Sequence, residues 1–308
     1  MMQWINWKPR SWAVLCLLVL LLSGRDLYAI MINPIEYDPA NPGETFDVTS
    51  LVAPILGGTG IAITSASLTL SIDQVDIGAT RAGTCTNDSE TYRIGDGLVM
   101  STGDVRSYED GISTSTVCCN GIDDPHFNGD FGGMASESQD ALLDQITVTE
   151  DLDYFDVVEL DITFDMVSGF DTVYFAMVFG SEEFSEDWQG FANDGFGAFL
   201  NDVSIALLSI STTEAYAADI SGTELDGVYA PSGDPFLVFL NSSDLFDVGN
   251  VLTFIMADAS DSVIDTTVYI SGLGGVPPSK VPEPASLLLM GSGLAFLFSI
   301  RKKFKGRV

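Results

Sequence analysis

Positive charge is scarce in this chain of 308 residues, which has 12 Lys and Arg residues against 44 Asp and Glu residues, and a single His. Of the Lys and Arg residues, only Arg81, Arg93 and Arg106 lie between residues 30 and 276. Every acidic residue except Asp26 and Glu283 lies in that segment. Binding of nucleic acid or anionic lipid requires clustered Lys and Arg. The central segment is therefore not expected to bind nucleic acid, and its self-repulsion suggests that calcium stabilises it.

Catalytic motifs are missing as well. His126 stands alone in an acidic segment, and the sequence has no G-x-S-x-G, H-E-x-x-H or P-loop pattern. Paired carboxylates can hydrolyse glycosides, but in so acidic a chain close pairs arise by chance. The protein is predicted not to be an enzyme, and a polysaccharide hydrolase is kept only as a remote alternative.

Cysteines are few, and an odd number remains outside the N-terminal apolar segment that contains Cys16. Cys85 is expected to pair with Cys118 or Cys119, closing a loop of about 34 residues that the chain-entropy model values at about 3 to 4 kcal/mol. The remaining thiol could form an intermolecular bond, a vicinal bridge or no bond. A structural disulfide is favoured over a metal or redox site, because no C-x-x-C spacing occurs.

Long hydrophobic runs occur only at the two ends of the chain. Near the start, Lys8 and Arg10 precede the apolar segment 12–22, which is followed by a small-residue cleavage site at Ala29. An apolar run of about 11 residues is short for a membrane span, which needs about 20. Residues 1–29 are therefore predicted to be a signal peptide, handled by the Sec translocon and cleaved after Ala29 by signal peptidase.

The other end contains a proline-flanked glutamate, an apolar stretch up to Ile300 and a basic cluster at 301–307. The basic cluster should stay cytoplasmic by the positive-inside rule. About 16 apolar residues is short for a permanent span, so residues 281–308 are predicted to form a transient transmembrane sorting helix. The segment before this stretch reads Val281, Pro282, Glu283, Pro284, Ala285 and Ser286.

These features, in this order, resemble the PEP-CTERM sorting signal. The resemblance implies recognition by an exosortase, a membrane protease-transpeptidase of Gram-negative bacteria that make extracellular polysaccharide, with processing near Pro282 to Pro284. It further implies an intermediate anchored in the inner membrane and a product at the cell surface or outside the cell.

Between the two ends, alternating apolar and polar residues predict strands. Apolar residues alternate along 158–166, and the same pattern returns at 173–179 after a Ser168-Gly169 turn, so these two runs are expected to be neighbouring antiparallel strands. One short helix is expected at 138–145. The further expected strands are 66–72, 97–101, 196–200, 203–210, 235–240, 251–257 and 267–271.

Many short strands separated by turn residues are typical of an all-β protein. The expected fold is a single β-sandwich, jelly-roll-like, at residues 30–271. Residues 272–280, with paired Gly and paired Pro residues, read as a linker to the sorting segment.

The segment between the strands ending at 179 and beginning at 196 is rich in carboxylates. Calcium takes six to eight oxygen ligands in flexible geometry, which such a loop can supply, although a solvated acidic loop is an equally good interpretation. The candidate calcium ligands are Glu182, Glu183, Asp187, Asn193 and Asp194.

This segment is also similar to the choice-of-anchor L family, whose motifs match 97–103 (GLVMSTG), 179–184 (FGSEEF) and 193–200 (NDGFGAFL). Phe184 stands where that family usually has Tyr, and Gly195 makes the match to the last motif less close. The resemblance covers about residues 97–272 and implies a domain attached to surfaces through differing C-terminal anchors. In this interpretation Phe179, Phe196 and Phe199 face the core, and Glu182, Glu183 and Asp194 converge where the hairpin closes.

The function favoured by these observations is a non-catalytic surface or extracellular-matrix component, exported, sorted by an exosortase and stabilised by calcium. The alternative is a carbohydrate-binding or adhesive module that contacts extracellular polysaccharide, with Trp188 and Tyr154 stacking on sugar rings.

Overall fold

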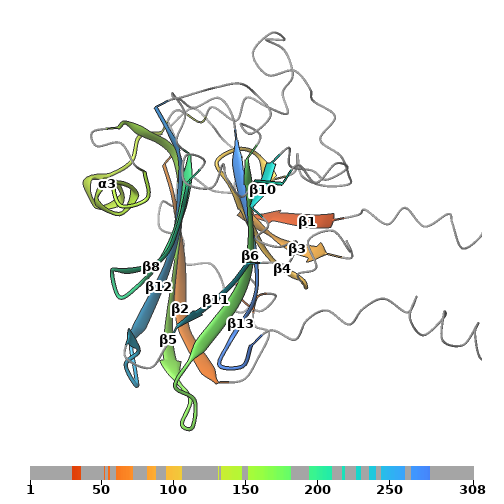
Figure 1. Ribbon diagram of the computed structural model, residues 1–308, viewed down its shortest axis with the longest axis vertical. Coiled ribbons are helices and arrows are strands. Elements are labelled where there is room, and N and C mark those ends of the chain that lie inside the picture. Colours follow the sequence, from red (N-terminus) through yellow and green to blue (C-terminus); the bar gives the residue numbers. More distant parts are fainter. Residues whose placement is uncertain are drawn as a thin grey trace, which may run out of the picture.

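The computed structural model consists of strands in two facing antiparallel sheets and one short helix (Figure 1). It describes residues 30–35, 52, 55, 60–71, 82–87, 95–105, 131, 133–147, 152–181, 194–209, 217–218, 227–229, 236–240, 244–260 and 265–277. The all-β class is confirmed, and each predicted strand corresponds to an observed one. Within the described part, no helix is long and apolar enough to cross a membrane.

Of the described strands, eight form the first sheet, in the order β1-β3-β4-β13-β6-β10-β9, with β11 also pairing with β6. Their bounds are β1 Ile30–Ile35, β3 Ala82–Asn87, β4 Gly97–Ser101, β6 Val173–Ser181, β9 Ala217–Ala218, β10 Gly227–Tyr229, β11 Phe236–Leu240 and β13 Thr266–Gly274. The strand β13 thus runs beyond residue 271, where the domain was expected to end.

The second sheet has the order β2-β5-β12-β7-β8. Its long strand β5 alternates buried apolar residues with polar ones from residue 158 to 165, whereas β12 is buried on both sides, because its outward residues Ile255, Ala257 and Ala259 belong to a second apolar cluster. The bounds are β2 Ile61–Leu70, β5 Tyr154–Met166, β7 Gly195–Leu200, β8 Val203–Ser209 and β12 Asn250–Ala259.

The runs 158–166 and 173–179 are strands, but they are not neighbours. Strand β5 pairs with β2 and β12 in the second sheet, whereas β6 pairs with β13, β10 and β11 in the first. The predicted hairpin is therefore wrong. The alternation shows that each strand has a side that faces the core. It does not show whether the two strands are neighbours in one sheet or lie in facing sheets, because both arrangements give the same pattern.

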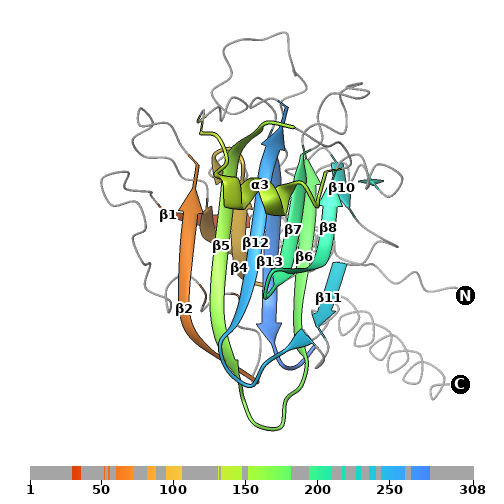
Figure 2. The same cartoon turned by 90° about the vertical axis from the view of Figure 1, so that its left-hand side faces the viewer.

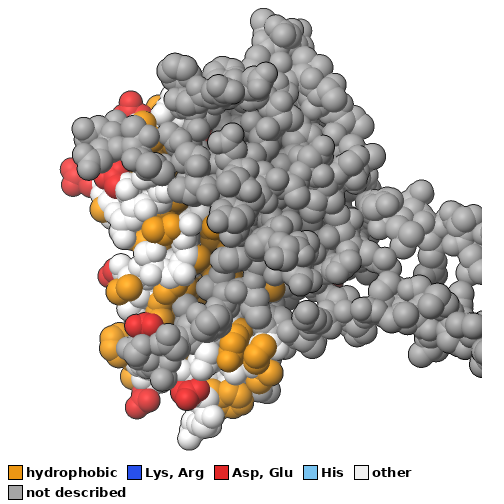
Figure 3. Space-filling view, in the orientation of Figure 1, with side chains coloured by type: hydrophobic (Ala, Val, Ile, Leu, Met, Phe, Trp, Pro, Cys, Tyr) orange, Lys and Arg blue, Asp and Glu red, His pale blue; other side chains and the backbone are white. Residues whose placement is uncertain are grey.

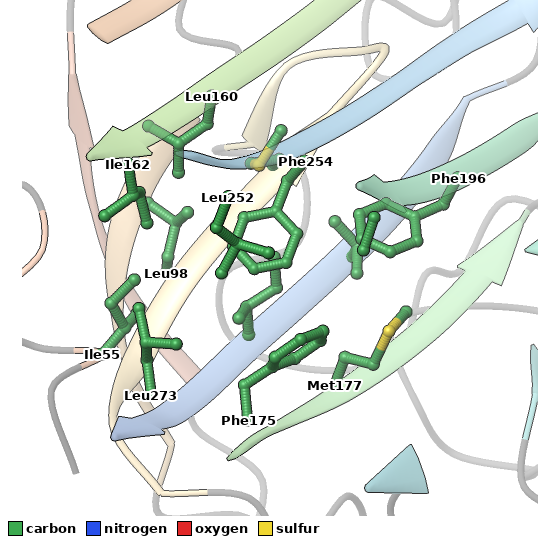
Figure 4. Packing of buried hydrophobic residues seen from close by; sticks show 14 of the residues in the cluster. Ile55, Leu98, Leu160, Ile162, Phe175, Met177, Phe196, Leu252, Phe254 and Leu273 are labelled. Carbon is green, nitrogen blue, oxygen red and sulfur yellow. The ribbon is translucent and has the colours of Figure 1, made fainter. Parts of the chain in front are cut away.

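The main core lies between the sheets and contains large side chains from both (Figure 4). Phe254 of β12 contacts Phe175 of β6 edge-to-face, with ring centroids 5.1 Å apart, and Phe196 of β7 at 6.0 Å. Aromatic pairs of this kind add about 0.5 to 1.5 kcal/mol to the burial of their surface. The same rings join the two sheets.

The helix α3, Glu137–Leu143, lies across the outer face of the second sheet (Figure 2). Ser136 and Gln139 form a capping box at its start, as Ser136 accepts from the Gln139 amide and Gln139 accepts from the Ser136 amide. Beneath it lies a second apolar cluster that includes Leu143, Tyr154 and Phe199. Phe179 and Phe196 face the main core as predicted, but Phe199 points to the opposite side of its sheet.

Candidate functional site

Three adjacent strands of the second sheet carry aspartates at the same end of their core-facing rows. In β12 the inward positions Leu252, Phe254 and Met256 are followed by Asp258, and Met256 lies opposite both Val158 of β5 and Phe196 of β7. Asp194 lies two positions before Phe196 and so continues the inward row of β7, because side chains alternate along a strand. Asp156 lies where the pairing of β5 with β12 is irregular, and its charge acts on Asp258 together with that of Asp194. We call Asp156, Asp194 and Asp258 the aspartate row.

A β-bulge helps to position this row. The pairing of β12 with β5 shifts between Met256 and Asp258, and Asp156 takes the left-handed conformation with φ of 52°. Bulges bend a strand and redirect its side chains. Asp156 is fully buried, and one of its carboxylate oxygens accepts from the Phe131 amide at 3.2 Å.

Asp194 is a structural acceptor. One carboxylate oxygen accepts from the Ala259 amide at 3.0 Å, and the other accepts from the Thr266 hydroxyl at 2.8 Å. These bonds join the start of β7 to the end of β12 and the start of β13. The residue is therefore a link between the two sheets at this end.

Asp258 has a different environment. It is fully buried, and neither of its carboxylate oxygens has a hydrogen-bond partner. The Thr102 hydroxyl is close enough to lower its pKa slightly, but that hydroxyl donates to the Thr266 carbonyl at 3.5 Å. Burial, and then the charges of Asp194, Asp265 and Asp156, raise the pKa of Asp258 well above its usual value.

The end of β4 closes the site from the opposite sheet. The Ser101 hydroxyl donates to the Thr266 carbonyl at 3.2 Å and accepts from the Gly103 amide at 3.0 Å. A Cβ atom at Gly103 would overlap the carboxylate of Asp265. The predicted motif at 97–103 therefore has a physical role here, because its last glycine makes room for a buried acid.

The predicted calcium site is only partly testable. Of its five residues, Asp194 is described and lies in the aspartate row, whereas Glu182, Glu183, Asp187 and Asn193 fall outside the described residues. The expected hairpin is wrong here too, because β6 and β7 belong to different sheets. Among the residues that the structure describes, no group of three or more His, Cys, Asp or Glu side chains is arranged to hold a metal ion.

A second set of carboxylates lies on the outer face of the second sheet. Burial raises the pKa of Glu159, against a hydrogen bond from Gln139 of α3 at 2.9 Å, and burial also raises the pKa of Asp161, which accepts from Thr253. Both are acceptors in structural contacts.

Tyr154 is not a surface platform for sugars. It is 2% exposed, and its hydroxyl hydrogen-bonds with Thr147 at 2.6 Å and donates to Asp144 at 3.1 Å. Burial, the largest cause, raises its pKa to about 12. Its place in the sugar-binding hypothesis is thereby withdrawn, and Trp188 lies outside the described residues.

The remaining predicted sites are largely outside the described part of the chain. Cys85 lies in β3, opposite Ile32 and Gly97, whereas Cys118 and Cys119 are not described, so the disulfide stays a prediction. The cleavage position Ala29 and the sorting residues 281–285 are likewise outside it.

The central segment of the chain matches a known protein family. A family model described as the choice-of-anchor L domain matches residues 38–227, more than half of the chain. The chain belongs to the choice-of-anchor L family. A second model, the PEP-CTERM protein-sorting motif, matches residues 280–303. Comparison with curated proteins gives no significant match.

The family match begins earlier than the motifs suggested and stops before the last strands. Strands β12 and β13 lie beyond residue 227, yet β13 is the middle strand of the first sheet's main path and β12 the middle strand of the second sheet. Asp156 and Asp258 were not among the predicted site residues, although both continue apolar alternating rows in the sequence. An acid in register with core positions is the signal that would have found them.

Proposed function

We propose that this choice-of-anchor L protein is a non-catalytic component of the cell surface or extracellular matrix of a Gram-negative bacterium, and that exosortase processing delivers it there. The PEP-CTERM match at 280–303 carries the proposal, because such motifs mark exported proteins that are anchored in the membrane only transiently. The signal peptide at 1–29 and the transmembrane helix at 281–308 are part of it.

Processing in cells tests this sorting route. The full chain is expressed in a host with and without its exosortase, and the membrane and external fractions are compared by immunoblot. A shortened product outside the cells should depend on the exosortase, and Glu283→Ala should leave the chain in the membrane. The control is Asp171→Asn, which changes an exposed acid in the β5–β6 turn and should be processed normally. Equal release from both hosts would exclude this route.

The proposal that the domain is not catalytic rests on the described carboxylates. Asp194, Glu159 and Asp161 serve as hydrogen-bond acceptors in structural contacts, and Asp258 is fully buried. Incubation with the host's own polysaccharide, followed by sizing of the products, tests it. Release of oligosaccharides that stops in Glu182→Gln would support the hydrolase instead.

We further propose that calcium stabilises the folded domain by lowering the mutual repulsion of its carboxylates, those of the aspartate row among them. The support is Asp258, whose carboxylate is fully buried without a hydrogen bond and faces three more aspartates. Burial of an ionised carboxylate beside other carboxylates is costly, and a divalent cation nearby lowers that cost. Calcium is the divalent cation that prefers carboxylate and carbonyl oxygens in flexible geometry.

Thermal unfolding of the purified chain in EDTA and in added calcium tests this. A ligand that binds only the folded state at 100 times its Kd stabilises it by about 2.7 kcal/mol. Asp258→Asn should lose most of the calcium-dependent rise in Tm, whereas Asp171→Asn should keep it. A wild-type Tm that does not respond to calcium would exclude this role.

A further inference from the structure

The exposed apolar side chains of the sandwich gather at the end opposite the aspartate row. Among the described residues, seven large apolar side chains are exposed, and of these only Met134 and Leu207 lie away from this end. The other five, which we call the apolar end, are Val167, Val203, Phe246, Val248 and Val276. Figure 3 shows apolar side chains at the lower end of the molecule with acidic ones beside them, and further apolar side chains higher on the same face.

Backbone contacts connect these residues to one another. The Met166 amide donates to the Asp247 carbonyl at 2.9 Å, which places the 246–248 loop beside the end of β5. The Val167 amide donates to the Gly60 carbonyl at 3.0 Å, and Gly60 lies against Gly275, the residue before Val276. The Asn201 amide donates to the Val251 carbonyl, which brings the β7–β8 turn to the same end.

Phe246 is held in its exposed position by a buried residue. The Asn250 side chain, fully buried, donates to the Phe246 carbonyl at 2.7 Å and accepts from the Phe246 amide at 2.7 Å. Two short bonds from one buried amide fix the backbone of this loop. The aromatic ring nevertheless remains 61% exposed, so the fold presents it to the outside.

The chain leaves the sandwich at this same end. Strand β13 starts beside the aspartate row and finishes at Gly274, next to Tyr174 at the start of β6. The sorting motif begins at residue 280, and its apolar stretch begins at 287. Nine residues, 278–286, can span at most about 30 Å, since an extended chain advances about 3.3 to 3.6 Å per residue.

We infer that the apolar end contacts the membrane in which the chain's own sorting segment is anchored. The inference rests on the proposed sorting route, because it needs the anchored intermediate. A short tether holds the domain near the bilayer, and exposed aromatic and aliphatic side chains partition into the interface between headgroups and acyl chains. The domain would then stand on the membrane with the aspartate row pointing away from it.

The charges at this end restrict the kind of lipid surface. Asp202, Asp244 and Asp247 are exposed around the apolar side chains, and Asp165 accepts from the Gly249 amide. Negative side chains are repelled by anionic headgroups over about 10 Å at moderate ionic strength. The surface therefore fits zwitterionic headgroups better than anionic ones.

Fluorescence quenching by brominated lipids tests the contact. The full chain is reconstituted into phosphatidylcholine vesicles whose acyl chains carry bromine, and tryptophan is placed at one end or the other. Phe246→Trp reports the apolar end, and Met134→Trp is a matched control, because both residues are 61% exposed and Met134 lies beside the start of β5 at the opposite end. The parent chain supplies the background of its own tryptophans.

The expected result is a loss of fluorescence from tryptophan at position 246 and none at 134. Replacing phosphatidylcholine by phosphatidylglycerol should reduce the loss at 246. Equal quenching at both positions, or none at 246 in vesicles that retain the chain, would overturn the inference. Exosortase-dependent processing in cells would then still stand, so the two failures can be told apart.

Discussion

At one end of the sandwich carboxylates are buried, and at the other apolar side chains are exposed. Both ends are built from the same strands, since β5, β7 and β12 contribute to each. At the buried end Asp258 continues an inward row, whereas at the exposed end Asn250 fixes a loop that turns Phe246 outward. A buried carboxylate costs stability, and an exposed aromatic side chain adds none through burial, so both ends have features that folding alone does not require.

The largest expected effect breaks the buried end directly. Gly103→Ala places a Cβ atom against the Asp265 carboxylate, and overpacking of this kind costs up to about 3 kcal/mol. Chemical denaturation of the purified chain should show this loss. Gly95→Ala is the control, because nothing lies within 4 Å of its added Cβ, and it should leave the unfolding free energy nearly unchanged. Equal losses in both variants would contradict the close contact.

The next effect loosens the apolar end. Asn250→Ala removes two bonds of 2.7 Å to the backbone of Phe246, at a cost of about 0.5 to 1.5 kcal/mol for each bond. Hydrogen exchange should rise at the Phe246 amide and in the loop around it. Protection at the aspartate row should stay close to that of the wild type, and a loss spread evenly over both ends would mean that the two ends are not independent.

Replacing Asp258 should stabilise the folded state, whereas the two changes above destabilise it. Its raised pKa means that the folded state binds a proton more tightly than the unfolded state does. Without calcium, the free energy of unfolding should therefore fall as the pH rises above the usual Asp pKa of 3.8, and it should stop falling once the folded-state pKa is passed. Each unit by which the folded-state pKa exceeds the usual pKa corresponds to about 1.4 kcal/mol. Asp258→Asn should flatten this profile and raise Tm at neutral pH.

Part of the slope should survive in that variant, because burial also raises the pKa of Glu159 and Asp161. The measurement is Tm against pH in EDTA for both proteins. A steeper profile in Asp258→Asn, or a Tm that falls toward acid pH in the wild type over this range, would contradict the assignment.

The smallest effect on stability is expected for Phe246→Ser. The side chain is exposed, so the unfolding free energy should change by no more than about 0.5 kcal/mol. The contact between the apolar end and phosphatidylcholine vesicles should nonetheless weaken in the anchored chain. A tryptophan that replaces Val248 reports this contact, because brominated lipids should quench it less in the Phe246→Ser variant. An unchanged quenching signal would separate exposure from membrane contact.

Much of the local structure could be predicted from the residues alone. The segment 97–101 is the strand β4, the alternating runs at 158–166 and 173–179 are strands, and the one predicted helix at 138–145 corresponds to α3. These succeed because side-chain alternation and capping are local. The strand at 82–87 was not predicted, because its Gly, Thr, Cys and Asn residues give no clear apolar alternation.

The acidic composition, most of the long strands and the sorting segment could be recognised from the residues alone, since each is a property of consecutive residues. The folded structure was needed to show that β5 and β6 lie in different sheets and that Asp156 and Asp194 lie near Asp258. It also placed Phe246 and Val276 at one end, 30 residues apart in the chain. The reason is physical, because alternation says which side of a strand faces the core, while long-range pairing decides which strands are neighbours.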